Sequence, residues 1–289
     1  MFDLHVHAGP CVAHRRADDV DTVAAYAAAG FDGLVLKGHC EPTVGRAVAA
    51  ARAVAATRTD SSSRAAVGLN VHGGLVLNAP AGGFNPVAVE SALTLGARVV
   101  WLPTVDARAH HAAGLAHPPS CAPALPRGPG FAAPPLDAAT EQPLRTIFAS
   151  IARADAVLAT GHLGAVELPW VVATARELGV RRILLTHPTF TVPDLEVADI
   201  DALLAPGVFA EFTTYQLLHQ PGMDAGRLAA IIERLGPERC VLSSDAGQPD
   251  SPPGPAALQL LVDALIDAGL DAAAVVAMAS TQPRQLVER

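Results

Sequence analysis

Two histidines, His5 and His7, stand one residue apart near the start of the chain, and Asp3 precedes them. Successive side chains of a strand point to opposite faces, so a strand over 2–7 would place all three on one face. Two neutral imidazoles that lie close together can bind one divalent metal ion. A pair of buried, hydrogen-bonded histidines would give the same pattern, and this short motif alone does not separate the two interpretations.

Three further apolar runs each end in a residue of a type that binds metals. The runs are short and continuously apolar, which is typical of parallel strands buried on both faces. They cover 156–160, 182–186 and 240–244, and they lead into His162, His187 and Asp245. Because the ligand type recurs at the C-terminal end of every run, the sequence predicts a metal site at the carboxyl ends of a parallel sheet.

Strand and helix signals alternate along the whole chain. Expected strands cover 2–7, 33–38, 66–71, 98–102, 156–160, 182–186, 207–212 and 240–244. Expected helices cover 17–29, 43–57, 86–95, 142–154, 168–179, 194–205, 223–235 and a last stretch that begins near Ala256. Eight such repeats predict an α/β fold, a (β/α)8 TIM barrel formed by a single domain over 1–289. Active sites of such barrels lie at the carboxyl ends of the strands, where the candidate ligands fall.

One segment, 104–141, breaks this alternation and shows no periodic pattern. A loop of this length inside a compact domain is usually functional or disordered. Because it follows the fourth strand, it begins on the active-site face. We expect a lid or wall over the pocket, and a mobile surface insertion is the alternative.

Composition narrows the function classes. The chain has 289 residues, of which 51% are hydrophobic, and its formal net charge is −8. This charge argues against a nucleic-acid surface or a polybasic membrane patch. No apolar run reaches the roughly 18 residues of a membrane span, and because no charged-then-apolar stretch precedes the first strand we expect no secretory signal. The four cysteines form no C-x-x-C pair, so we expect free thiols and a cytoplasmic protein.

Taken together, these residues resemble the amidohydrolase superfamily of metal-dependent barrel enzymes over nearly the whole chain. The matching parts follow strands 1, 5, 6 and 8, and they are His5-x-His7, His162, His187 and Asp245. The tail 281–286 is similar to the end common in that superfamily. The stretches 36–39, 74–78 and 242–248 resemble a little-characterised branch of it. The resemblance implies metal-dependent hydrolysis and no particular substrate.

The chain departs from the binuclear members, which carry a bridging carboxylated Lys or a Glu after strand 4. The strand at 98–102 offers neither, and Asp106 is the nearest carboxylate. Lys37, at the end of the second strand, could replace the bridge as a carbamate. Otherwise Lys37 is a cation that binds a substrate carboxylate or an oxyanion. Glu211, at the end of the seventh strand, is a weaker candidate ligand.

A single metal is also compatible with the sequence. Its ligands would be His5, His7, His162 and Asp245, and His187 would then contact the substrate or the attacking water. Imidazole and carboxylate ligands suit Zn²⁺, and to a lesser degree Mn²⁺, Fe²⁺ or Ni²⁺. Such an ion lowers the pKa of its bound water from about 15.7 towards about 7. Asp245 would accept the proton of this water, and a histidine would stabilise the oxyanion.

Several functions remain open on these grounds. The first is a hydrolase that attacks a C–N or C–O bond of a small molecule such as an amide, a cyclic amide or a lactone. Alternatives are a metal-dependent decarboxylase or lyase, a phosphoesterase of the polymerase-and-histidinol-phosphatase type, and a non-catalytic metal or ligand binder. The candidate substrate-binding residues are Arg15, Arg16, His39 and Asn78. Their basic members favour an anionic substrate, and the sequence also allows a homo-oligomer.

Overall fold

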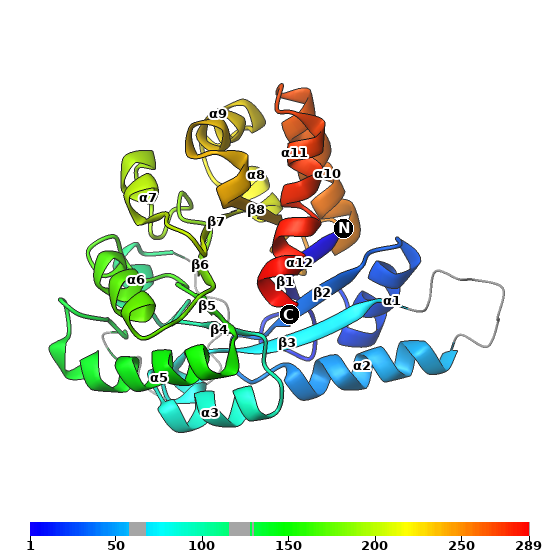
Figure 1. The fold of residues 1–289 in the computed structure, drawn as a ribbon. Coiled ribbons are helices and arrows are strands. Elements are labelled where there is room, and N and C mark those ends of the chain that lie inside the picture. Colours follow the sequence, from blue (N-terminus) through cyan, green and yellow to red (C-terminus); the bar gives the residue numbers. More distant parts are fainter. Residues whose placement is uncertain (58–67, 116–127, 129, 289) are drawn as a thin grey trace. The chain divides into compact units, whose positions relative to one another are not determined.

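The computed structural model describes residues 1–57, 68–115, 128 and 130–288 (Figure 1). Its strands form one sheet in the order β1 to β8, and the registers from β1 to β7 are parallel. The strands are β1 Phe2–His7, β2 Gly33–Lys37, β3 Asn70–Val76, β4 Val99–Trp101, β5 Val157–Ala159, β6 Ile183–Leu185, β7 Val208–Thr213 and β8 Cys240–Ser243. This is the α/β fold of the (β/α)8 TIM-barrel class, as the sequence predicts.

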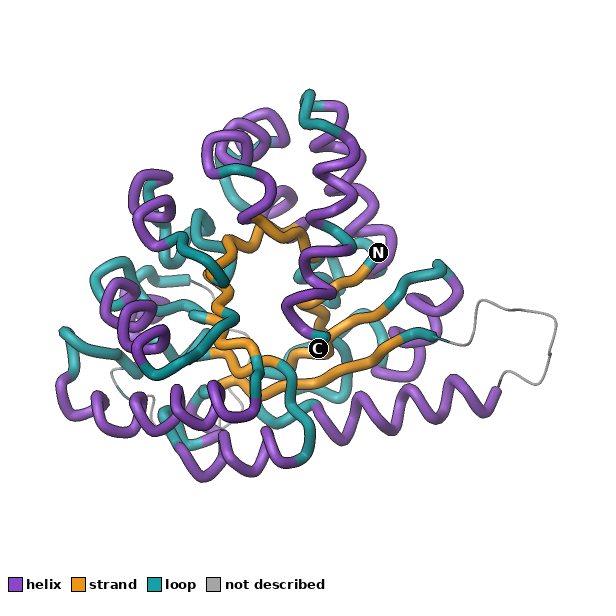
Figure 2. The backbone as a smooth tube through the Cα atoms, viewed as in Figure 1, coloured by secondary structure: helices purple, strands orange, loops and turns teal. Residues whose placement is uncertain are grey.

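Helices separate the strands along the chain, as Figure 2 shows in purple. The α-helices of the described residues are α1 Asp19–Ala28, α2 Val44–Thr57, α3 Pro86–Thr94, α4 Arg108–Ala112, α5 Glu141–Ala154, α6 Leu168–Glu177, α7 Val197–Leu203, α8 Thr214–His219, α9 Ala225–Leu235, α10 Gly254–Asp267, α11 Ala272–Met278 and α12 Thr281–Val287. Several helices begin after a residue whose side chain accepts a hydrogen bond from a backbone N–H group of the first turn. Asp18 accepts from Asp21 N at the start of α1, and Asp224 accepts from Arg227 N at the start of α9, both at 2.8 Å.

The described chain forms two compact units. The first unit consists of Met1–Lys37, Thr43–Gly73 and Phe212–Arg289, and the second consists of Gly38–Pro42 and Gly74–Glu211. The single domain over 1–289 stays a prediction, and each unit is described by itself below.

In the first unit, β1 is buried along its whole length and runs beside the residues that follow β8. Asp245 N donates to His5 O at 2.9 Å, and His7 N donates to Ala246 O at 2.8 Å. These two hydrogen bonds fix the register of the two segments. They therefore bring together residues that lie at opposite ends of the sequence.

The third strand differs from its expected position at 66–71, of which 66–67 lie outside the described residues. It runs from Asn70 to Val76, so Gly73 and Gly74 lie within the strand and not after it. A Cβ at Gly73 would lie 2.6 Å from the backbone carbonyl of Thr43, and the backbone therefore approaches closely there. Glycines interrupt the apolar pattern from which strands are predicted, which explains the misplaced end of this strand.

In the second unit, the ends of the non-periodic segment 104–141 pair with each other. Phe131 N donates to Asp106 O, and Arg108 N donates to Phe131 O, both at 2.8 Å. Between these contacts lies the short helix α4, while 116–127 and 129 lie outside the described residues. The lid function of this segment stays a prediction.

Among the described cysteines, Cys40 differs from expectation, and Cys121 lies outside the described residues. Cys11 and Cys240 are free thiols, but Cys40 is disulfide-bonded, so the prediction that all four are free is wrong for Cys40. Burial raises the pKa of the Cys240 thiol to about 12, so this thiol stays protonated at neutral pH. Among the described helices, none combines the length and apolar character that crossing a membrane requires.

Candidate metal centre

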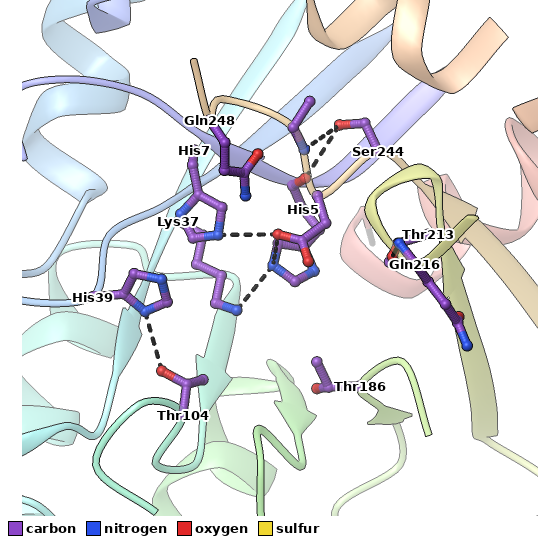
Figure 3. A network of polar contacts seen from close by, with 12 residues as sticks. His5, His7, Lys37, His39, Thr104, Thr186, Thr213, Gln216, Ser244 and Gln248 are labelled. Atoms are coloured by element: carbon purple, nitrogen blue, oxygen red, sulfur yellow. Dashed lines mark hydrogen bonds and ion pairs between the residues drawn. The ribbon is translucent and has the colours of Figure 1, made fainter. Parts of the chain in front are cut away.

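Three predicted ligands converge in the first unit, where β1 and the end of β8 meet. The Nε2 atoms of His5 and His7 lie 3.1 and 3.2 Å from Asp245 Oδ1, and the two imidazole rings are 5.3 Å apart (Figure 3). All three residues are buried. Within the described part of the chain, only this group brings three or more such ligand atoms within 4.8 Å of one another.

The backbone at Asp245 holds an uncommon conformation. Its φ is 48°, in the left-handed region that few residues other than glycine adopt. Two residues on, Gly247 has a φ of 124°, and a Cβ there would lie 2.0 Å from His7 O. The chain therefore turns tightly over the end of β1, and this turn directs the Asp245 carboxylate onto the two imidazoles. Strained backbone of this kind is often found at functional sites.

The buried carboxylate of Asp3 stabilises the backbone that carries this cluster. Asp3 Oδ1 accepts from His5 N at 3.3 Å and from Ser244 N at 3.1 Å, while Asp3 Oδ2 accepts from the Tyr26 hydroxyl at 2.5 Å. Burial raises the pKa of Asp3 to about 6, although these hydrogen bonds lower it. Tyr26 and Ser244 were not predicted from the sequence. The only signal for Ser244 is that it directly precedes the predicted ligand Asp245.

The protonation states of the cluster suit a cation. Burial raises the pKa of Asp245, but His5 and His7 outweigh this effect and hold it well below its usual range. Burial lowers the pKa of His7 well below its usual value, and the charge of Arg15 lowers it further. A carboxylate and a neutral imidazole are the forms in which these groups bind metals.

Lys37 is buried at the end of β2, where its Nζ lies 2.9 Å from His5 Nε2 (Figure 3). The same imidazole nitrogen faces Asp245, so the amine borders the group of three ligands. This position is compatible with both roles expected for Lys37, as a carbamate or as a cation.

The second unit contains another cluster, formed by the predicted ligands His162 and His187 together with His110. The rings of His162 and His187 are 5.0 Å apart, and His110 Nδ1 lies 2.8 Å from His162 Nδ1. All three histidines are buried, and His187 has a left-handed φ of 26°. The sequence predicts no role for His110, because this residue lies in the non-periodic segment. Its only signal was its place shortly after the fourth strand.

Two predicted substrate-binding residues of the second unit belong to one hydrogen-bond network. His39 Nδ1 lies 3.1 Å from the hydroxyl of Thr104 (Figure 3). Asn78 Nδ2 donates to His39 O at 3.1 Å, and Asn78 Oδ1 accepts from Thr104 N at 2.8 Å. The Asn78 amide therefore ties together the segments that follow β2, β3 and β4.

The two carboxylates that could replace the missing bridging ligand, Glu211 and Asp106, have different surroundings. Glu211 is buried in β7 of the second unit. Asp106 accepts a hydrogen bond from Ala79 N at 2.8 Å, so it caps a short 3-10 turn at Ala79–Ala81. Its carboxylate thus has a local structural partner.

The two neighbouring arginines differ in their surroundings. Arg16 Nη1 donates to the carbonyls of Pro249 and Ser251 at 3.1 and 2.9 Å, and Arg16 N donates to Gly247 O at 2.9 Å. Arg16 therefore holds the loop after β8. Arg15 has a buried Nε that no hydrogen-bond acceptor of the described residues reaches.

Solved structures with the same fold span nearly the whole chain. An amidohydrolase from Pseudomonas aeruginosa is 12% identical, with a TM-score of 0.61 over 99% of this chain and 95% of that one. Organophosphorus hydrolase from Deinococcus radiodurans is 17% identical, with a TM-score of 0.57 over 99% and 92%. N-acetyl-D-glucosamine-6-phosphate deacetylase from Mycobacterium smegmatis is 16% identical, with a TM-score of 0.55 over 99% and 75%. At these identities the likeness shows a shared fold, the (β/α)8 barrel that the sequence predicts.

The fold and the ligand cluster thus define a TIM barrel with a candidate metal centre. Residues 1–211 match the model of a family of unknown function, DUF6282, and the chain belongs to that family. A search of curated proteins finds no significant match to the sequence.

Proposed function

We propose that this protein is a metal-dependent hydrolase that uses metal-activated water to cleave a C–N or C–O bond of a small molecule. An amide, a cyclic amide or a lactone is the substrate class expected. The observation that carries the proposal is the buried group of His5, His7 and Asp245, whose ligand atoms lie within 4.8 Å of one another. The deacetylase and the hydrolases that share the fold support the reaction class.

The donor set fits a divalent transition metal. Two imidazole nitrogens and one carboxylate oxygen face one another, and the low pKa of His7 and of Asp245 leaves both groups ready to bind. Such ligands suit zinc best, with Mn²⁺, Fe²⁺ or Ni²⁺ as alternatives. The bound ion would supply a water that ionises near neutral pH and a Lewis acid for the carbonyl. Asp245 would accept the proton of this water and pass it to the leaving group.

Two alternative roles are proposed for His162 and His187. They serve as further ligands, of the same metal or of a second one, or they stabilise the oxyanion by hydrogen bonding. Glu211 is the weaker candidate for a ligand. Removing each side chain separately and counting the bound metal decides between these roles.

Basic groups favour an anionic substrate. Lys37 and Arg15 both belong to the first unit, and both lower the pKa of His7 by their charge, after the larger effect of burial. Among the described residues, Arg15 forms no ion pair, so its guanidinium is suited to a carboxylate or phosphate group of the substrate. The deacetylase that shares the fold is named for a phosphorylated sugar.

Lys37 and Arg15 also support a second candidate function, that of a metal-dependent decarboxylase or lyase on the same barrel. In that reaction Lys37 or Arg15 would bind the carboxylate that is lost. The phosphoesterase and the non-catalytic binder are weaker alternatives.

A substrate screen tests the proposal. Zinc-loaded protein is incubated with amides, cyclic amides, lactones, phosphate esters and aromatic acids, and the products are identified. Turnover of an amide or a lactone that disappears in the double variant His5→Ala, His7→Ala supports the hydrolase. Decarboxylation alone supports the lyase, and turnover that this double variant retains rejects the proposed site.

A further inference from the structure

His110 and His162 form a closely fitted pair inside the second unit. Their Nδ1 atoms are 2.8 Å apart, their ring centroids are 4.9 Å apart, and the ring planes are nearly parallel, with an angle of 21° between them. Both side chains are buried, with exposed fractions of 5% and 8%. The contact joins α4 to the segment after β5, across 52 residues of sequence.

The distance identifies the kind of contact. Two nitrogens bound to one tetrahedral zinc ion, each at about 2.0–2.1 Å, would lie about 3.3 Å apart. The observed 2.8 Å is shorter and matches a direct N–H···N hydrogen bond. The pair also belongs to no group of three ligand atoms within 4.8 Å in the described residues. A hydrogen bond is therefore favoured over shared metal binding.

The backbone around both rings is held in place. On the His110 side, Arg108 N donates to Phe131 O at 2.8 Å. On the other side, His162 N donates to Pro103 O at 2.9 Å. The buried Glu167 carboxylate accepts from Gly164 N and Ala133 N, both at 2.6 Å, so it ties the His162 loop to the segment after β4. The segment after β4 thus holds His110 against His162.

A hydrogen bond between two neutral imidazoles fixes their tautomers. One Nδ1 must carry the proton and the other must accept it, because each neutral ring has one N–H and one lone pair. Whichever ring donates through Nδ1 keeps the lone pair on its own Nε2. Partners of this kind orient ligating histidines and set which nitrogen is available.

We infer that His110 is a positioning residue that accepts a hydrogen bond from the Nδ1–H of His162 and thereby leaves the lone pair on His162 Nε2. The direction of this hydrogen bond rests on the proposed function, in which His162 serves as a ligand. The reverse direction would make His162 Nε2–H a donor to the substrate. The tautomer of His162 thus depends on His110, a residue that lies outside the strand-end motifs.

The tautomer can be measured without substrate or metal. Uniformly ¹⁵N-labelled metal-free protein gives ring-nitrogen resonances, and those of His162 are identified by their loss in His162→Gln. His110→Asn keeps an acceptor near the position of Nδ1, whereas His110→Leu removes it. His111→Leu on the same helix is the matched control, since the Nε2 atom of His111 lies 4.0 Å from Asp106 Oδ1.

We expect the Nδ1–H form of His162 in the wild type, in His110→Asn and in His111→Leu, and its loss in His110→Leu. Metal affinity at His162 should fall by about 10- to 100-fold in His110→Leu and recover in His110→Asn. An unchanged His162 tautomer in a folded His110→Leu, as judged by thermal unfolding, overturns the inference. An Nε2–H form in the wild type rejects the direction of this hydrogen bond but does not affect the proposal that His5 and His7 bind a metal.

Zinc titration separates the remaining interpretation. If His110 resonances shift on zinc binding as those of a ligand do, and His110→Leu loses one metal equivalent, then His110 is itself a ligand and the positioning role is wrong. If none of the proteins binds any metal, although His5 and His7 are intact in all of them, then the proposed function is wrong. The pairing of the two rings is not contradicted by that result.

Discussion

The hydroxyl of Tyr26 donates to the Asp3 carboxylate at 2.5 Å, and the same carboxylate accepts from the backbone of His5 and of Ser244. One side chain of α1 thus stabilises the junction of β1 and β8 from which the candidate ligands project. Both Tyr26 and Asp3 are fully buried, so neither group can exchange its partner for water.

Tyr26→Phe is therefore expected to destabilise the protein by about 1–3 kcal/mol, the cost of leaving a buried polar group without its hydrogen bond. Denaturant unfolding measures this change. Zinc affinity should also fall, because the spacing of His5 and Asp245 depends on Asp3. Asp32→Asn is the control, since this half-exposed carboxylate pairs with the N-terminal amine and not with Tyr26. A Tyr26→Phe protein with wild-type stability would show that the hydrogen bond contributes nothing.

Metal content tests the cluster of His5, His7 and Asp245 directly. Protein produced with zinc available should contain at least one transition metal per chain by elemental analysis. The double variant His5→Ala, His7→Ala should lose that metal, because it removes two of the three donor atoms, while most of the fold stays. His14→Ala, which changes an exposed histidine, is the control and should keep the metal. Metal-free wild-type protein under these conditions contradicts the whole site.

Asp245→Asn separates metal binding from proton transfer. The variant nearly preserves the shape of the side chain but removes the base, so turnover should fall by about 10²–10⁴-fold. Zinc affinity should fall less, since both imidazoles remain. Turnover is measured with the substrate that the screen identifies, and metal content is measured on the same sample. Near-normal turnover with metal bound would mean that another residue is the base.

Lys37 has two roles that metal counting distinguishes. A carbamate on Lys37 would bridge two metals, so Lys37→Ala would lose one metal equivalent, and electron density would extend beyond the amine in a crystal structure. A substrate-binding cation would leave the metal content of Lys37→Ala unchanged and would mainly raise KM for an anionic substrate. Addition of bicarbonate should affect the metal content of the wild type only in the first case.

The site residues that could be predicted from the sequence lie in or directly after an apolar strand. Side-chain alternation within one strand placed His5 and His7 on one face, and the register of neighbouring segments then added Asp245. Tyr26 and His110 could not be found in this way, because each acts through a partner 23 or 52 residues away and neither lies in or directly after a predicted strand.

The fold was predictable for a related reason, since apolar runs and helix periodicity are local. The exceptions are also physical. In β3, Gly73 and Gly74 are required where backbones approach closely, and glycine contributes no apolar side chain to the pattern. The pairing of Cys40 depends on tertiary structure, which cysteine spacing does not specify.

Arg15 and Arg16 provide a final test, because adjacent arginines have different surroundings. Arg16 donates to the carbonyls of Pro249 and Ser251, so Arg16→Ala should loosen the loop after β8 and lower the melting temperature. Arg15 lacks an ion-pair partner among the described residues, so Arg15→Ala should leave the melting temperature nearly unchanged. With an anionic substrate, Arg15→Ala should raise KM about 10-fold or more, as expected for a lost charged hydrogen bond of about 1.5–3 kcal/mol. A neutral analogue of the same substrate should show no such change. An equal effect on both substrates would mean that Arg15 supports the loop and does not bind the anion.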